Sequence, residues 1–439
     1  MIMCYFYITH YPTMFNNLSD TEIADLHDTI NDLIDNYIED NMIYIFNPDF
    51  KDEMIKSITE LVVNDYLYSI EIIVSDEDNE EIYSSIEELT EECIDNYCIY
   101  NKIPKRSNSI TFEEDGLENK EYLSKTIDYL KNQEQPQQKT REWYLFRYNL
   151  ITASNLWKVF GTDSQVNSLI YEKCKPFQEY NYESMQSGPL FWGIKYEPVT
   201  IMIYEQMFNT KIADFGCIKH PIYSFIGASP DGINVETSNM RYGRMLEIKN
   251  IFNREITGIP KKEYWIQMQL QMEVCRLNKC DFVETRIKEF TDQEEFMENK
   301  DKYEYKGMVV ELLPKFKPCD MSNNNEVLAM NKNKFVYELL SNEDDEESID
   351  SINQRIKTDN ENHYIYEIKY WYLDEFSCVL VHRNTLWFEK SVPEIEKIWS
   401  TIEKERVGGY EHRASKKRTS SVDNTQRNGC LLEMSDDST

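Results

Sequence analysis

The sequence predicts an α/β (α+β) protein, in which a core of strands and helices follows an acidic helical region. Three observations predict this fold class. Apolar residues recur at helical spacing between residues 18 and 100. Short apolar strand patterns then alternate with helical patterns between residues 140 and 290. Strand alternation returns over residues 364–386, and a helical pattern follows over residues 392–404.

The composition favours an intracellular, soluble protein. A length of 439 residues is enough for two or three domains. No apolar run reaches the length of about 18 residues that a membrane-spanning helix needs. Residues Met1 to Met14 lack the charged start and apolar core of a signal peptide. The 10 cysteines include no Cys-x-x-Cys pair, which argues against zinc and iron–sulfur sites.

The net charge of −32 is distributed unevenly along the chain. Residues 1–139 are strongly acidic, whereas residues 140–290 are close to neutral. Phosphate binding requires a local basic groove and does not require a basic chain. The overall charge therefore does not exclude a nucleic-acid substrate that binds to the near-neutral part.

These patterns divide the chain into four parts. Residues 1–103 are expected to form an acidic helical accessory domain that begins with a capping box at Ser19–Glu22, or else a partner-docking bundle without chemistry. Residues 104–139 are expected to be a linker with one short helix. Residues 140–407 are expected to form the α/β domain, with an irregular acidic insertion at about 291–360. The remaining residues, 408–439, read as a disordered polar tail.

The first candidate functional segment of the α/β domain contains Arg147, Thr152 and Ser154. Arg147 falls in a predicted helix, and Thr152-Ala-Ser154 is typical of the cap of the next helix. Free N–H groups at a helix start, two hydroxyls and an arginine are suited to a phosphate. The alternative interpretation is plain capping beside a surface arginine.

A second segment, residues 227–249, carries two acids and a lysine. Asp231 lies in a Ser-Pro-Asp-Gly turn, and Met245–Lys249 is predicted to be a strand. Because side chains alternate along a strand, Glu247 and Lys249 share one face while Leu246 and Ile248 face a core. Two converging carboxylates repel each other unless a divalent cation such as magnesium or manganese lies between them. The alternative is a surface hairpin with an ordinary Glu/Lys pair.

Two predicted helices supply further polar side chains. Glu197 lies in a helix predicted over residues 193–208, and Gln267 and Gln271 share one face of a helix predicted over residues 264–274. Amides at that spacing are suited to hold a water or a phosphate oxygen. Each of these groups is also compatible with an ordinary solvated helix face.

In this order the segments resemble the phage lambda exonuclease / YqaJ viral recombinase family of PD-(D/E)XK nucleases. The resemblance covers about residues 140–290, with a weaker echo at 361–405. It rests on five motifs in sequence: Arg147 seven residues before Ser154 within Ile-Thr-Ala-Ser, Gly193-x-x-x-Glu197, Ser229-Pro-Asp231-Gly, Leu246-Glu-Ile-Lys249, and Tyr264-x-x-Gln267-x-Gln269.

The resemblance implies a mixed sheet flanked by helices and an Mg²⁺- or Mn²⁺-dependent DNA exonuclease that acts on linear duplex DNA, 5′→3′. The metal would be held by Asp231, Glu247 and the Ile248 carbonyl, with Glu197 at a second metal or bound through water. Lys249 would position the attacking water or hold the scissile phosphate, with Gln267 as support. Arg147, Thr152, Ser154 and Ser229 would bind a DNA 5′ phosphate. Gln269 and Gln271 are secondary candidates.

The resemblance also implies partners and a setting. Double-stranded DNA is the expected substrate, a single-strand annealing protein a candidate partner, and a homotrimer a candidate assembly. The composition is similar to that of proteins from large DNA viruses of eukaryotes. Such a protein would work in viral recombination or replication, in the cytoplasm or viral factory of the host, or inside the virion. No membrane association is expected.

The chain departs from the compact phage enzyme in three places, namely a longer loop between Asp231 and Glu247, the acidic N-terminal region, and the 291–360 insertion. The last two leave the ring assembly open. Two alternative functions therefore remain. One is an endonuclease or structure-specific nuclease with the same core. The other is a non-catalytic DNA-binding or virion packaging protein built on a nuclease scaffold.

Overall fold

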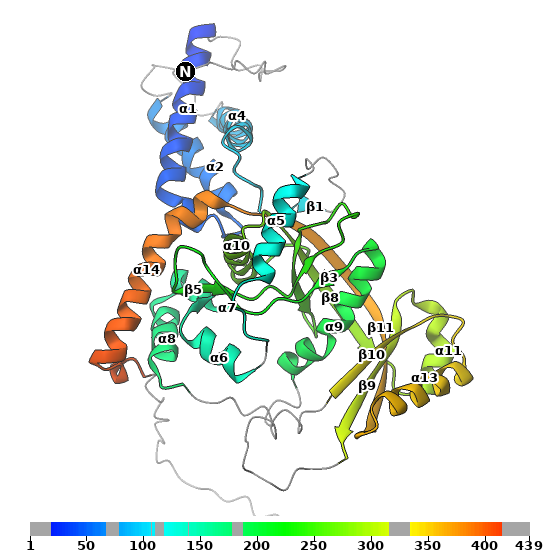
Figure 1. Ribbon diagram of the computed structural model, residues 1–439. Helices are drawn as coiled ribbons and strands as arrows, with labels where there is room; N and C mark the ends of the chain where they lie inside the picture. Colours follow the sequence, from blue (N-terminus) through cyan, green and yellow to red (C-terminus); the bar gives the residue numbers. More distant parts are fainter. Residues whose placement is uncertain are drawn as a thin grey trace, which may run out of the picture.

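The computed structural model describes residues 19–66, 79–106, 108–109, 118–138, 140–177, 188–315 and 334–414. Figure 1 shows helices packed around a long curled sheet, with the N-terminal helices at one end of the molecule. Among the described residues, no helix is both long and apolar enough to span a membrane. The end of the predicted tail, residues 415–439, lies outside the described residues, as do residues 1–18.

The predicted helical N-terminal region is confirmed as α1 (Asp20–Asn41), α2 (Phe50–Leu61) and α4 (Asn79–Tyr100), with η2 (Met42–Tyr44) and η3 (Val62–Tyr66) between the first and last. The capping box is present, because Ser19 and Glu22 bond each other's backbone N–H groups. The helices dock on the rest of the chain: the ring of Phe46 lies 5.8 Å from that of Phe160, and Trp387 donates to the Ile43 carbonyl at 3.2 Å.

The main sheet has strand order β10-β9-β11-β8-β7-β6-β3, and β1 pairs with β11. The strands are β1 (Asn108–Ser109), β3 (Ile212–Ala213), β6 (Gly232–Asn234), β7 (Met245–Asn250), β8 (Lys279–Glu289), β9 (Lys306–Pro314), β10 (Lys334–Leu340) and β11 (His363–His382). β7 and β8 run parallel, whereas β6 and β7 run antiparallel. The sheet is therefore mixed, as predicted.

Two long helices flank the sheet beside β7. Helix α9 (Pro189–Phe208) packs Tyr204 against Leu246 and Ile248 on one face. Helix α10 (Lys262–Cys275) lies on the opposite face, toward which Glu247 points. The apolar and polar positions of β7 thus face different helices, as the period of two requires.

A second, three-stranded sheet has the order β2-β5-β4, formed by Ile151–Thr152, Ile226–Ala228 and Ile218–Lys219 respectively. The apolar pattern over residues 218–226 is typical of a single strand, but this segment instead contains β4 and the start of β5. His220 Nδ1 accepts the N–H groups of Ile222 and Tyr223 at 3.1 and 3.0 Å, which reverses the chain between β4 and β5. Around this sheet lie α6 (Arg141–Tyr148), α7 (Ala153–Leu156), η4 (Trp157–Phe160) and α8 (Asp163–Cys174).

The irregular insertion predicted at residues 291–360 is also wrong in its local structure. The segment contains α11 (Gln293–Asn299), η6 (Lys300–Lys302), strands β9 and β10, and α13 (Glu346–Asp359). Met308, Val310 and Leu312 alternate inward and bury a separate apolar core with α13. On the opposite face Val309 packs in a second apolar core with Trp371, so β9 is apolar on both faces and lacks the alternation of a half-buried strand.

One strand joins the hairpin of β9 and β10, called the outer hairpin below, to the rest of the sheet. β11 has 20 residues; its first half pairs with β9 and its second half with β8. In Figure 1 the orange β11 runs from the outer hairpin into the centre of the molecule. The hairpin of β9 and β10, with α11 and α13 packed on it, therefore extends the main sheet at one edge.

The predicted linker and tail are both more ordered than the sequence indicates. Helix α5 (Lys120–Lys131) buries Leu123, Ile127 and Leu130, and Gln135 accepts the Gly216 N–H at 2.9 Å. Helix α14 (Thr385–Gly408) is followed by η7 (Glu411–Arg413), whose Arg413 pairs with Glu405. Residues 408–414 thus belong to the folded part, which corrects the predicted start of the tail.

Candidate active site

The hairpin of β6 and β7 brings Asp231 and Glu247 together. Asp231 stands directly before β6, and its Oδ2 accepts the backbone N–H of Ile248 at 2.7 Å. Gly232 must follow, because a Cβ at this position would lie 2.3 Å from Cγ2 of Ile212 on β3. The backbone of β7 thus fixes the Asp231 carboxylate beside the strand that carries Glu247 and Lys249.

Glu247 is a fully buried carboxylate, with 0% of its surface exposed. Its Oε2 accepts hydrogen bonds from Gln267 and Gln271 of α10, both at 2.8 Å. Its Oε1 accepts the ammonium of Lys249. The surface hairpin considered from the sequence is therefore excluded, because an exposed Glu/Lys pair would not be buried under two amides.

The surroundings of Asp231 strongly disfavour the charged form of its carboxyl group. Burial raises the pKa of its carboxyl well above the usual range, and the negative charges of Glu247 and Glu197 raise it further. Lys249 and the Ile248 N–H act in the opposite direction without cancelling the effect. Glu197 lies half-buried on α9, and its charge reaches Asp231 even though it comes from a different element.

Lys249 stays charged in this setting. Burial alone would lower the pKa of its ammonium, but the charges of Glu247 and Asp231 outweigh burial and raise the pKa. The Nζ atom also lies 4.9 Å from the centre of the Tyr264 ring on α10, a cation–π arrangement. The lysine is thus held as a cation between carboxylates and an aromatic face.

The donor set fits a small divalent cation. Magnesium is commonly held by one or two carboxylates together with water, and Asp231 and Glu247 supply hard oxygen atoms that repel each other. Among the described residues, no three His, Cys, Asp or Glu side chains form a compact metal-binding group. Asp231 and Glu247 are therefore the principal ligands that the described residues offer. The roles predicted for the Ile248 carbonyl and for Glu197 stay predictions.

The predicted phosphate-binding residues also come together. The guanidinium of Arg147 donates to Ser154 Oγ at 2.9 Å and to Ser229 Oγ at 3.4 Å. Ser154 and Thr152 share a hydroxyl contact of 3.4 Å. Thr152 caps α7 as predicted, although α7 has only four residues. An arginine of α6 and three hydroxyls from β2, α7 and the Asp231 turn thus converge on one place.

Trp143 of α6 is a further member of this cluster, beyond the residues predicted from the sequence. Its indole lies under the Arg147 guanidinium at 4.2 Å and donates to Ser229 Oγ at 3.3 Å. The spacing of four residues on one helix, Trp143 to Arg147, is a signal that identifies such a pair. Lys173 lies beside the cluster, where its Nζ donates to the Arg147 carbonyl at 2.8 Å, and burial lowers the pKa of its ammonium to about 7.

The amides of α10 divide between two faces. Gln271 connects the two clusters, because its Nε2 reaches both Glu247 and the Ser229 carbonyl, the latter at 3.3 Å. Gln269 does not join the site. Its amide instead bridges the His382 carbonyl at 2.8 Å and the Asn384 N–H at 2.7 Å. A step of two residues on a helix rotates the side chain away from the face of Gln267.

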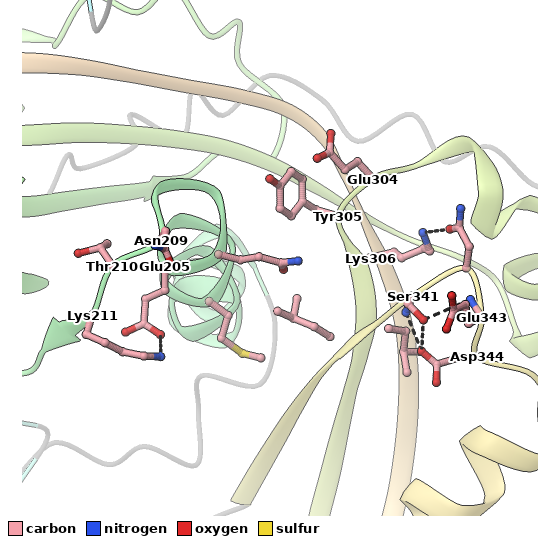
Figure 2. Close-up of a pocket in the computed structure, with 15 residues that line it drawn as sticks. Glu205, Asn209, Thr210, Lys211, Glu304, Tyr305, Lys306, Ser341, Glu343 and Asp344 are labelled. Carbon is pink, nitrogen blue, oxygen red and sulfur yellow. Dashed lines mark hydrogen bonds and ion pairs between the residues drawn. The ribbon is translucent and has the colours of Figure 1, made fainter. Parts of the chain in front are cut away.

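A cleft of about 1020 Å³ lies elsewhere, between the end of α9 and the ends of the β9–β10 hairpin. Figure 2 shows that several of its polar side chains bond one another. Lys211 pairs with Glu205 at 3.0 Å, and Asp344 accepts from Ser341. None of the candidate site residues lines this cleft.

Comparison with known proteins places the site within a recognised domain. Residues 142–278 match the family described as the YqaJ-like viral recombinase domain. An uncharacterized protein of Acanthamoeba polyphaga mimivirus is 28% identical over 304 residues, which covers 63% of this chain and 54% of the relative. The chain thus spans about half the length of this viral relative.

Two solved structures show a distant likeness. Both are of an alkaline exonuclease, one from Laribacter hongkongensis and one described in complex with dAMP. Each is 20% identical, with TM-scores of 0.32 and 0.34 respectively. The alignments cover 62% and 61% of this chain and 95% and 94% of the solved chains.

Proposed function

From the premise that residues 142–278 carry a YqaJ-like viral recombinase domain, we propose that this protein is a metal-dependent deoxyribonuclease of the lambda exonuclease family. Its substrate is linear duplex DNA, which it degrades from a 5′-phosphorylated end during viral recombination or replication. The observation that carries the proposal is the excess of negative charge at Asp231 and Glu247, next to the Arg147 cluster. The two carboxylates suit a cation, and the Arg147 cluster suits a phosphate.

Asp231 and Glu247 would hold a magnesium or manganese ion. When bound, the ion supplies Lewis-acid polarisation of the phosphodiester and neutralises charge that develops on its oxygens. Gln267 and Gln271 fix the plane of the Glu247 carboxylate through its Oε2. This leaves Oε1 as the atom whose partner can change. Lys249, kept charged by its neighbours, stabilises negative charge on the scissile phosphate or orients the attacking water.

The Arg147 cluster would bind the terminal phosphate of the DNA. Charge-assisted bonds from a guanidinium are stronger than those between neutral groups, and the hydroxyls of Ser154, Thr152 and Ser229 add donors. Trp143 restricts the guanidinium from below. Because Gln271 contacts both clusters, the distance between the terminal phosphate and the scissile bond is set by a single helix. A terminal phosphate bound here would select for chain ends.

The test is digestion of linear duplex DNA with 5′-phosphate or 5′-hydroxyl ends, with and without Mg²⁺. We expect degradation only with Mg²⁺. DNA with 5′-phosphate ends should be degraded at least about tenfold faster than DNA with 5′-hydroxyl ends. Arg147→Met removes this preference while retaining slow, Mg²⁺-dependent cleavage. Arg355→Met is the matched control, because Arg355 pairs with Glu338 on the outer hairpin. We expect this variant to keep the preference for the phosphorylated end.

Covalently closed circular DNA separates the competing functions. A strict exonuclease leaves the circle intact, whereas cleavage of the circle at a comparable rate identifies an endonuclease and overturns the proposed exonuclease activity. Salt-sensitive DNA binding with no cleavage in Mg²⁺ or Mn²⁺ identifies a non-catalytic DNA-binding protein and overturns the proposal as a whole.

A further inference from the structure

Glu284 is an acid close to the site that the proposed reaction does not yet use. It lies on β8, with 1% of its surface exposed. Its Oε1 accepts the guanidinium of Arg254. Its Oε2 is buried and has no hydrogen-bond partner. A buried carboxylate oxygen without a donor is costly, so this atom calls for a partner that the present arrangement does not supply.

The register of the sheet places this carboxylate beside Lys249. β7 and β8 run parallel, and Lys249 pairs directly with Glu284. Side chains of paired residues on neighbouring strands project to the same face. Tyr264 confirms this face, because its ring lies 4.9 Å from Lys249 Nζ and 5.8 Å from the Arg254 guanidinium, the partner of Glu284. The lysine therefore has two carboxylates within reach of its side chain, Glu247 and Glu284.

Lys249 and the proposed divalent cation would both bind Oε1 of Glu247. Lys249 occupies that oxygen, while Gln267 and Gln271 occupy Oε2. A divalent cation held by Asp231 and Glu247 would compete for Oε1 and repel the ammonium. Resting on the proposed metal-dependent function, we propose that Glu284 is a positioning residue for Lys249: when a cation engages Glu247, the ammonium transfers its hydrogen bond to Glu284 Oε2. Glu284 thereby keeps the lysine charged and near the scissile phosphate.

The test measures Mg²⁺ binding by calorimetry on the full chain without DNA. Glu284→Gln keeps an oxygen for Arg254 but presents an NH₂ group to Lys249, so the lysine has nowhere to go and competes with the cation. We expect the Kd for Mg²⁺ to rise about fivefold. In a Lys249→Met background, the same substitution changes the Kd less than about twofold, because no ammonium needs to be placed.

Glu338→Gln is the matched control, since Glu338 is also a strand carboxylate paired with an arginine, Arg355. It leaves the Kd for Mg²⁺ unchanged. An equal rise of the Kd for Glu284→Gln in both backgrounds means that Glu284 acts on the cation directly and overturns the inference alone. No saturable Mg²⁺ binding to the wild-type chain overturns the inference together with the metal-dependent function.

A second measurement needs only the wild-type fold. The ammonium nitrogen resonance of Lys249, assigned by its loss in Lys249→Met, is followed by NMR during Mg²⁺ titration. We expect it to shift with the same midpoint as the calorimetric Kd. A resonance that stays in place at saturating Mg²⁺ shows that the ammonium keeps its partner, which overturns the transfer even where Glu284→Gln does not fold.

Discussion

Two buried carboxylates on neighbouring strands, Asp281 and Glu247, have opposite electrostatic surroundings. Asp281 of β8 bonds the guanidinium groups of Arg241 and Arg244 and the hydroxyl of Tyr204. Its charge is therefore more than neutralised. Glu247 of β7 shares the single cation Lys249 with Asp231. The sheet thus carries a self-sufficient cluster on its α9 face and a cluster with missing positive charge on its α10 face.

The difference separates an acid that stabilises the fold from an acid that is suited to a ligand. A buried charge whose partners are already present contributes to the fold only, because a further cation would find no unbalanced charge. The raised pKa of Asp231 shows that the cluster of Asp231, Glu247 and Lys249 has an excess of negative charge. Function is thus assigned to the cluster that the polypeptide leaves incomplete, and removing the carboxylate charge from each cluster in turn tests that assignment.

The largest expected effect is on catalysis at Glu247. Glu247→Gln preserves shape and an oxygen for the two amides but removes the charge. We expect the single-turnover cleavage rate on linear duplex DNA to fall about 1000-fold, which corresponds to roughly 4 kcal/mol. The comparison variant Asp281→Asn is expected to retain the rate within about threefold under the same conditions, since Asp281 touches no proposed substrate atom. A loss of similar size in Asp281→Asn would contradict the distinction.

The second effect is on stability at Asp281. Asp281→Asn leaves two partly buried arginines without their carboxylate, and we expect the free energy of unfolding to fall by about 3 kcal/mol. Urea unfolding followed by circular dichroism measures this loss. Glu247→Gln should lose much less in the same assay. An equally large loss for Glu247→Gln would mean that both clusters serve the fold.

A third effect concerns the amides that hold Glu247. Gln267→Met removes one of the two donors to Oε2. We expect the cleavage rate to fall about tenfold, or roughly 1.4 kcal/mol, because the carboxylate is then less well oriented. Gln269→Met provides the contrast, since Gln269 bonds backbone groups near β11 and its loss should lower stability with little change in rate. Reversed outcomes would relocate the functional face of α10.

The smallest expected effect is on the pH dependence of stability at Asp231. The folded-state pKa of this acid is raised, so the folded chain binds a proton more readily than the unfolded chain. Its contribution to stability is therefore present at low pH and is lost as pH rises through the raised pKa. Asp231→Asn removes that loss, and we expect the melting temperature at neutral pH to rise by about 2 °C.

Scanning calorimetry across pH distinguishes this cause from a general effect of the substitution. The gain from Asp231→Asn should shrink as the pH is lowered, because the wild-type carboxyl then becomes protonated. Mg²⁺ should likewise raise the melting temperature of the wild type and not that of the variant. A gain that is the same at every pH would contradict the electrostatic explanation.

Much of the candidate site is predictable because it depends on local periodicity. Alternation along β7 places Glu247 and Lys249 on one face. The spacing of four residues places Gln267 and Gln271 together, and both in fact reach Glu247. The Arg147, Ser154 and Ser229 cluster is confirmed in its geometry, although its ligand stays a prediction.

The parts that escaped prediction depend on contacts between distant residues. Arg241 and Arg244 lie in the loop before β7, and nothing nearby in sequence indicates that they meet Asp281 on β8. Glu284 is found only through the pairing of β8 with β7. Strands β9 and β10 were missed because apolar residues occupy both of their faces, which hides the alternation of a half-buried strand.

The position of β11 has a consequence for how the chain folds during synthesis. This strand lies between β9 and β8, although all the residues that we assign to the site precede it in the sequence. Arg406 of α14, made later still, binds the carbonyls of Lys173 and Tyr148 at 2.8 and 2.9 Å, beside the Arg147 segment. Since long-range strand pairing waits for both strands, the sheet cannot close on a ribosome that has not passed residue 382. The nascent chain therefore has every reactive side chain before it has the frame that aligns them, and cleavage activity should first appear only after residues 382 and 406 have both been made.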